Sequence, residues 1–271
     1  MTVRRIGKGG VATSFIVKKS VLKRLLRGGS LECQKNIDAD PGWLQLSQVL
    51  QNIPGKGIAT MLGKIPEQQV VVKAQLRAEA QSEFDIQDRL KDYAGFVKYL
   101  CIFECDGDKE YISRFAFVND ATKICRAKGN SMGVIIMPYY ANGSLEDLLK
   151  SGVDTATDKS KLVKDTVVSV IGYLKDAYID SGFTHGDLFT KNILLDANNK
   201  PVIIDFEKSY FDKSISTFWR DIDDLLGDVS RYLYKTQIDD ACRVIMINRA
   251  YNLPPSDATL KDLIFAIQNM P

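Results

Sequence analysis

The chain has 271 residues, of which 45% are apolar and 26% are charged, the composition of a globular protein. At about 150 residues per domain, this length provides one large or two small domains with a substantial core. No apolar run approaches the ~20 residues of a membrane span, and the first residues lack the apolar stretch of a secretory signal. We therefore expect neither an integral membrane protein nor a secreted one.

The cysteine and histidine content limits which metal sites, disulfides and catalytic mechanisms the chain can have. The chain has five cysteines: Cys33, Cys101, Cys105, Cys125 and Cys242. Their odd number and the lack of a Cys-x-x-Cys pair argue against a disulfide framework and a thiolate zinc site, and favour a reducing, cytoplasmic compartment. His185 is the single histidine, which removes most metal chemistry and any mechanism that uses paired histidines.

Positive charge is concentrated at the N-terminus. Residues 1–35 have a net charge of +8, whereas the rest of the chain has a net charge of −6. Apolar residues recur there at roughly helical spacing: Phe15, Val21, Leu22, Leu25 and Leu26. We assign residues 1–42 to a basic N-terminal extension. Either it forms a helix that packs its apolar stripe on the body, or it binds an anionic partner (a membrane surface or nucleic acid) or directs entry into an organelle.

Beyond this extension, strands come first and helices follow. Strand-like patterns cover 45–53, 68–73, 97–104 and 133–137, with a helix predicted over 76–92 and an irregular polar stretch over 106–131. Helices are predicted over 144–150 and 161–179, then a hairpin of strands 193–195 and 202–204, and only helical patterns after Phe218. This order predicts an α+β fold with a small β-rich lobe (43–137), a helical lobe (138–271) and a cleft between them.

The most informative residues lie in the second lobe. They are His185-Gly186-Asp187-Leu188-Phe189-Thr190-Lys191-Asn192 and Ile203-Ile204-Asp205-Phe206-Glu207. Together they resemble the catalytic loop and a variant of the Asp-Phe-Gly motif of the protein-kinase-like superfamily. The resemblance covers roughly residues 45–235. It implies a compact, bilobal kinase-like fold with a truncated helical C-lobe, and an ATP- and Mg²⁺-dependent phosphotransferase.

The resemblance also implies roles for individual residues. Phosphoryl transfer needs clamped phosphates, metal charge and an acceptor hydroxyl that is oriented in line. Asp187 would hold that hydroxyl and take its proton, Asn192 and Asp205 would bind Mg²⁺, and Lys191 would reach the transferred phosphate. His185 is interpreted as a structural residue. Ordinary turn chemistry is the alternative for the Asp and Asn residues, and the neighbouring motifs argue against it.

The first lobe supplies the implied nucleotide contacts. Lys73, after two valines, matches the strand lysine that grips the phosphates, and Glu83 would be its ion-pair partner. Glu83 follows Lys73 by only ten residues, and Glu79 is a competing partner.

Two glycine-rich stretches compete for the phosphate-covering loop, 7–10 and 55–60. We choose Gly55 and Gly57, because a hairpin fits between them and Lys73, whereas the first stretch would require about fifty inserted residues. Leu62 then covers the adenine.

The segment around Pro138 resembles the kinase hinge. By this resemblance the Pro138 carbonyl accepts a hydrogen bond from the adenine amino group, the Tyr140 amide donates one, and Met137 lines the pocket.

Asp221 begins a predicted helix and, by the resemblance, holds the backbone of the catalytic loop. Asp221 follows Asp205 by only sixteen residues, no Ala-Pro-Glu follows, and Gly186 replaces the arginine that answers loop phosphorylation in many kinases. These departures predict an enzyme that is constitutively active. Glu207, in place of glycine, adds a third carboxylate near the metals.

Three functions stay open. The first is a protein kinase, with Ser/Thr acceptors favoured. The second is a small-molecule kinase of the aminoglycoside or choline phosphotransferase type, whose motifs are similar to His185-Gly186-Asp187 and Asp205-Phe206-Glu207. The third is a pseudokinase scaffold that binds nucleotide. The short chain leaves little material for a walled substrate pocket, which favours a protein acceptor.

Overall fold

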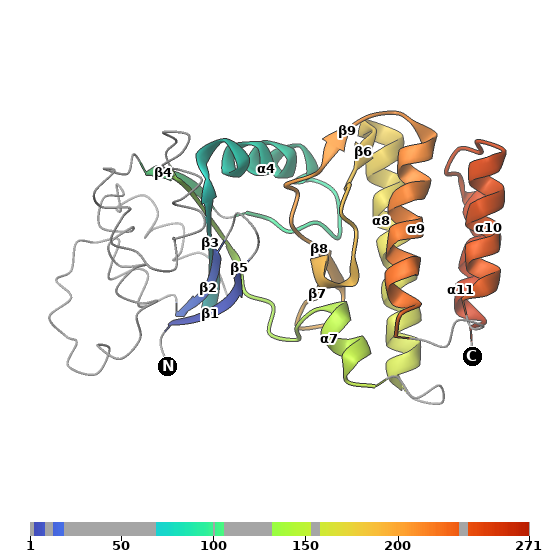
Figure 1. The fold of residues 1–271 in the computed structure, drawn as a ribbon, viewed down its shortest axis with the longest axis horizontal. Helices are drawn as coiled ribbons and strands as arrows, with labels where there is room; N and C mark the ends of the chain where they lie inside the picture. The colour runs from blue at the N-terminus through green and yellow to red at the C-terminus, as the bar shows by residue number, and fades with distance from the viewer. Residues whose placement is uncertain are drawn as a thin grey trace, which may run out of the picture. The chain divides into compact units, whose positions relative to one another are not determined.

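The computed structural model describes residues 3–8, 13–18, 69–99, 101–105, 132–152, 158–232 and 238–270 (Figure 1). The chain divides into two compact units, residues 1–85 with 98–139, and residues 86–97 with 140–271. Within the described residues no helix is long and apolar enough to cross a membrane. The content of helix and strand is mixed, as the α+β prediction requires. The cleft between lobes stays a prediction.

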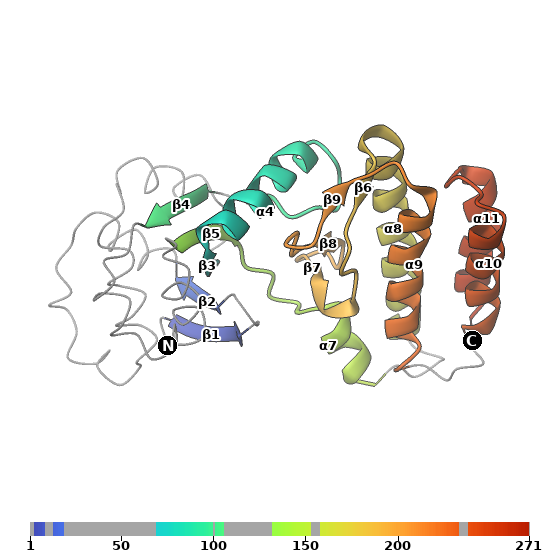
Figure 2. The ribbon, with the colours of Figure 1, turned by 45° about the horizontal axis from the view of Figure 1, so that its top comes forward.

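The first unit contains a five-stranded antiparallel sheet with the order β1-β2-β3-β5-β4 (Figure 2). Its strands are β1 (Val3–Lys8), β2 (Thr13–Lys18), β3 (Gln69–Leu76), β4 (Cys101–Cys105) and β5 (Met132–Pro138). β3 is central and pairs with β2 and β5. Its run Val70, Val71 and Val72 is buried, since β-branched side chains pack well on a sheet that is covered on both faces.

The helical interpretation of the N-terminal residues is wrong for 13–18, which form β2. This segment is rich in β-branched and aromatic residues, and Ile16 is buried. β2 pairs with β1, which is close in sequence, on one side and with β3, about fifty residues further on, on the other side. Its backbone groups are therefore satisfied on both edges. Residues 3–8 and 13–18 therefore belong to the sheet and not to a separate extension.

Residues 19–68 lie outside the described part of the chain. They include most of the basic segment and the strand expected over 45–53, so both stay predictions, as does the anionic partner.

Helix α4 (Arg77–Leu90) follows β3 without a connecting loop, close to the predicted bounds. The expected strand over 97–104 is shorter, since β4 begins at Cys101. Residues 95–97 pair instead with a strand of the second unit: Val97 donates to the Ile203 carbonyl at 2.9 Å, and Ile203 donates to the Gly95 carbonyl at 2.7 Å.

The second unit is mainly helical. Its helices are α7 (Leu145–Lys150), α8 (Asp158–Ser181), α9 (Ile215–Val229), α10 (Asp239–Ala250) and α11 (Asp257–Gln268). α8 packs on α7, α9 and α11, and α10 packs on α9 and α11 (Figure 1). The buried stripe of α8 includes the residues that the sequence placed there: Val163, Val167, Val170, Ile171 and Leu174.

Short strands between α8 and α9 carry the candidate site. β7 (Ile193–Leu195) and β8 (Pro201–Ile203) form the predicted hairpin, preceded by the 3-10 helix η1 (Thr190–Asn192). β6 (Phe183–Thr184) pairs with β9 (Tyr210–Phe211). The sequence did not predict this second pair, because two residues are too few to show an alternating pattern.

Candidate active site

The backbone of the loop 185–192 is held by a carboxylate from α9. Asp221 accepts a hydrogen bond from the His185 amide at 2.6 Å and another from the Gly186 amide at 2.9 Å. Asp221 is buried, and burial raises the pKa of its carboxyl, although His185 and the two amides act in the opposite direction. The structure thus places Asp221 where the sequence expected it, against the start of the loop.

A second carboxylate of α9 holds the end of the same loop, and the sequence interpretation missed it. Asp228 accepts hydrogen bonds from the Thr190 amide at 2.9 Å and from the Thr190 hydroxyl at 2.6 Å. Arg231 pairs with its other oxygen at 3.1 Å. Asp228 follows Asp221 by seven residues, two turns of helix, so both lie on the buried face of α9. In the sequence, Asp228 could have been recognised as an acidic residue at a position where the helix pattern calls for an apolar one.

His185 is a structural residue. It is fully buried, and its Nε2 lies 3.0 Å from the Ile204 carbonyl. Because a carbonyl only accepts, Nε2 carries the hydrogen, and Nδ1 accepts a hydrogen bond from the Asp187 amide at 3.3 Å. The histidine therefore connects the loop to the end of β8.

Asp187 lies among cationic and amide groups. Lys208 contacts its Oδ1 at 2.6 Å, and Lys191 lies 3.6 Å from its Oδ2. Asn192 donates to the Asp187 carbonyl at 2.8 Å and lies 3.4 Å from Oδ2. Partial burial raises the pKa of Asp187, but the Lys208 hydrogen bond and the charges of both lysines outweigh it and hold this pKa below its ordinary value. Asp187 is thus a carboxylate at neutral pH and can accept a proton.

The β7–β8 hairpin brings Asn192 and Asp205 to neighbouring positions. The Ile204 amide donates to the Asn192 carbonyl at 3.0 Å, so Asp205 is the next residue after a direct backbone link to Asn192. Asp205 has a φ of 71°, a left-handed conformation that aspartate tolerates better than most residues.

The chemistry of these two side chains suits a hard cation. The Asn192 amide nitrogen donates to Asp187, which leaves its Oδ1 as the acceptor atom. An amide oxygen and a carboxylate are ligands that Mg²⁺ accepts, together with the oxygens of a bound phosphate. Within the described ranges no group of three or more His, Cys, Asp or Glu side chains is arranged to hold a metal ion.

Gly186 has a physical reason to be glycine. Its φ is +77°, and a Cβ built on it would lie 2.5 Å from the Lys208 carbonyl oxygen. An arginine, which many protein kinases carry at this position, does not fit against the segment that follows Asp205.

That segment is fixed by several contacts within the second unit. Phe206 is fully buried, and the Ser209 hydroxyl donates to the His185 carbonyl at 2.8 Å. Further along, β9 pairs with β6, and the guanidinium of Arg89 lies 3.2 Å from the centre of the Phe211 ring. Glu207 is exposed, and its charge is one of those that raise the pKa of Lys208, after the larger effect of the Asp187 hydrogen bond.

In the first unit, Lys73 and Glu83 form a buried ion pair. The Lys73 ammonium lies 2.8 Å from Glu83 Oε2, and both side chains are buried. Gln75 donates to the same oxygen at 2.8 Å, and the Tyr99 hydroxyl donates to Oε1. Lys73 and Glu83 can pair although they are only ten residues apart, because β3 runs directly into α4 with no loop between them.

The predicted adenine contacts lie where β5 ends. Met137 is buried and pairs with Val71, Pro138 is the last residue of β5, and Tyr140, half-buried, begins the second unit. Their role toward a nucleotide stays a prediction.

Gly55, Gly57 and Leu62 lie outside the described residues, but the sheet bears on the choice between glycine-rich stretches. Gly7 belongs to β1 and pairs with Ser14 of β2, which pairs in turn with Lys73. Two strands, β2 and β3, therefore follow Gly7, and Lys73 lies on the second of them. The roughly fifty residues that seemed an unlikely insertion are those between β2 and β3. The choice between the two stretches stays a prediction, because residues 9–10 and 55–60 lie outside the described part of the chain.

A model of the RIO domain matches residues 103–241, about half of the chain. The chain belongs to the RIO domain family. RIO domains are atypical members of the protein-kinase-like superfamily, so the resemblance drawn from the catalytic loop is confirmed. The matched RIO region includes Asp187, Asn192, Asp205 and Asp221, and it begins after the Lys73–Glu83 pair. No curated protein matches the chain.

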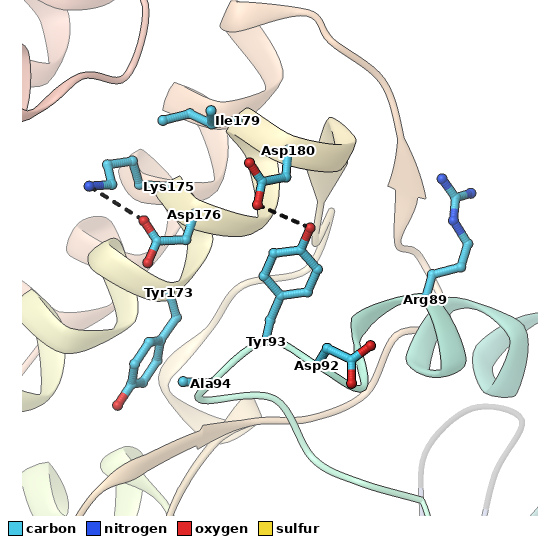
Figure 3. A pocket seen from close by; sticks show the side chains of 9 residues that line it. All are labelled: Arg89, Asp92, Tyr93, Ala94, Tyr173, Lys175, Asp176, Ile179 and Asp180. Atoms are coloured by element: carbon cyan, nitrogen blue, oxygen red, sulfur yellow. Dashed lines mark hydrogen bonds and ion pairs between the residues drawn. The ribbon is translucent and has the colours of Figure 1, made fainter.

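The second unit of this RIO chain also has an open pocket of about 720 Å³ between the end of α4, the following turn and α8 (Figure 3). Its lining carries two polar contacts: the Tyr93 hydroxyl donates to Asp180 at 3.3 Å, and Lys175 pairs with Asp176 at 3.4 Å. None of the predicted site residues lines it.

Proposed function

We propose that this RIO-domain chain is an ATP- and Mg²⁺-dependent protein kinase that transfers the γ-phosphate to a Ser or Thr hydroxyl of a protein. The observation that carries the proposal is the state of Asp187: an ionised carboxylate, partly buried, in a loop whose two ends are held by Asp221 and Asp228. A base in phosphoryl transfer must be charged and fixed relative to the acceptor oxygen.

The acceptor hydroxyl oxygen forms a bond to the γ-phosphorus, the bond from that phosphorus to the β–γ bridging oxygen breaks, and ADP carries the electron pair away. Asp187 accepts the hydroxyl proton. Asn192 and Asp205 would hold Mg²⁺, which supplies positive charge to the phosphates when bound.

Two lysines would supply further positive charge to the phosphates in this proposal. Lys73, oriented by Glu83, would contact the nucleotide phosphates, and Lys191 would neutralise the transferred phosphoryl group. Adenine would contact Met137, Pro138 and Tyr140.

Constitutive activity is part of the proposal. A phosphorylation switch works by ordering a loop that is otherwise out of place, usually through an arginine beside the catalytic aspartate. In this chain the residues from Phe206 to Phe211 are already tied to the catalytic loop and to β6, and Gly186 leaves no space for the arginine.

Phosphate transfer in the presence of Mg²⁺ tests the proposal. We expect wild type to phosphorylate casein-like proteins, and Asp187→Ala to lose at least ~100-fold in kcat, because a positioned base contributes about that much. Asp262→Ala removes an exposed carboxylate of α11 and serves as the matched control, with unchanged activity.

The same assay separates the alternatives. Turnover of aminoglycosides or choline without protein phosphorylation would assign the chain to small-molecule kinases. Nucleotide binding without any turnover would make it a pseudokinase. A loop phosphorylation that raises activity manyfold would contradict constitutive activity.

A further inference from the structure

We infer that Lys208 is a positioning residue for Asp187, which selects the carboxylate oxygen that receives the acceptor hydroxyl; this inference rests on the proposed function. Lys208 lies three residues after Asp205 and belongs to none of the motifs that the sequence singled out. Its ammonium makes the shortest of the cationic contacts that the structure shows at Asp187, 2.6 Å to Oδ1.

The position of Lys208 is set by the backbone on both sides of it. Phe206 is fully buried, and its ring packs edge-on against the ring of His185, with 6.0 Å between ring centres. Ser209 donates to the His185 carbonyl at 2.8 Å. Between these anchors, the Lys208 carbonyl approaches Gly186 so closely that only a glycine fits there. The backbone of Lys208 is therefore fixed next to the catalytic loop, so that its side chain can contact Asp187.

The two oxygens of Asp187 have unequal surroundings. Oδ1 receives the short, charge-assisted hydrogen bond from Lys208. Oδ2 has longer contacts, 3.4 Å to the Asn192 amide nitrogen and 3.6 Å to the Lys191 ammonium. Because a strong hydrogen bond to Oδ1 fixes the rotation of the carboxylate, Oδ2 is the oxygen that is presented to an acceptor hydroxyl.

Without the Lys208 ammonium, the Asp187 carboxylate keeps only its longer contacts with Asn192 and Lys191. The terminal torsion of an aspartate is broad, so the carboxylate then samples several orientations. Since a displacement of about 1 Å at a reacting centre lowers rates by as much as ~100-fold, the loss falls on the chemical step. Substrate affinity depends on other groups and stays nearly constant.

The test compares Lys208→Met, Lys208→Arg and a matched control. Lys200→Met removes one positive charge from an exposed lysine on the β7–β8 turn. We expect Lys208→Met to lower kcat by ~10–100-fold with the KM for ATP changed less than ~2-fold. Lys208→Arg, which can still donate to Oδ1, recovers most of the rate, and Lys200→Met matches wild type. A rise in KM at constant kcat, or no recovery by arginine, would overturn the inference.

A structural readout separates this inference from the proposed function. Crystal structures of wild type and Lys208→Met are compared at the Asp187 side chain, and we expect its orientation to change or to become multiple in the variant. An unchanged Asp187 in Lys208→Met would refute the positioning role. If wild type transfers no phosphate to any acceptor, the proposed function fails, and the crystal comparison alone decides whether Lys208 orients Asp187.

Discussion

The two units of this RIO-domain chain hold their carboxylates in different ways. In the first unit, Glu83 is fully buried and receives side-chain donors from Lys73, Gln75 and Tyr99. In the second unit, Asp221 receives two backbone amides of the catalytic loop, and Asp228 receives an amide and a hydroxyl of Thr190. The first arrangement fixes a side chain, whereas the second fixes a stretch of main chain.

This difference has a consequence for substitution. A network of side chains depends on each member, and loss of its central carboxylate removes the shared acceptor of all three donors at once. A carboxylate that binds main-chain amides instead determines the path of the loop, so its loss affects every residue of the loop while the fold around it persists.

The largest effect is expected at Glu83. Glu83→Ala removes the buried carboxylate that pairs with Lys73 and accepts hydrogen bonds from Gln75 and Tyr99. We expect a loss of ~3–5 kcal/mol in the free energy of unfolding, measured by urea denaturation. The control is Asp165→Asn, which breaks an exposed pair with Lys161 and is expected to cost less than ~1 kcal/mol. Equal losses for both variants would mean that the Lys73–Glu83 pair is not buried.

Asp221→Asn tests the main-chain arrangement. An asparagine has one acceptor oxygen, so its NH₂ group would face one of the two loop amides, and we expect a loss of ~1–3 kcal/mol. Hydrogen exchange at the His185 and Gly186 amides should accelerate. Asp223→Asn, at a half-buried position of the same helix whose carboxylate pairs with Arg249 and not with the loop, is the control and should leave both amides protected. Unchanged protection in Asp221→Asn would show that the loop does not depend on this carboxylate.

The smallest expected effect is the difference between two glycine substitutions, which separates the cost of a close contact from the cost of backbone strain. Gly186 and Gly152 both have positive φ, +77° and +84°, but a Cβ at Gly152 meets nothing within 4 Å. Gly152→Ala is expected to cost ~1–2 kcal/mol from its left-handed backbone alone. Gly186→Ala should cost about 1 kcal/mol more in thermal or urea unfolding, because the added methyl group must displace the Lys208 carbonyl. Equal costs would contradict the close contact.

The sequence predicted the second unit better than the first, for a physical reason. The stripe of α8, the β7–β8 hairpin and the loop from His185 to Asn192 are specified by residues that are close in sequence. β2 depends on pairing with β3 across about fifty residues, and local spacing of Phe15 with later leucines suggested a helix instead. Pairing between distant strands leaves no local pattern.

Within the candidate site, the motif residues were found and their neighbours were not. Asp187, Asn192, Asp205 and Asp221 carry a spacing that a family shares. Asp228 could have been found as an acidic residue on the apolar face of α9. Lys208 could not, because its contact with Asp187 depends on the folded path of the segment after Asp205.

The continuity of β3 with α4 limits how this kinase-like unit can be regulated. Many kinases are switched off when a helix swings on its linker and withdraws its glutamate from the strand lysine. Here Leu76 is followed at once by Arg77 as the first helical residue, so no linker exists on which such a hinge motion can occur. Separating Glu83 from Lys73 would require unwinding the first turns of the helix, so this buried ion pair is a permanent feature of its unit.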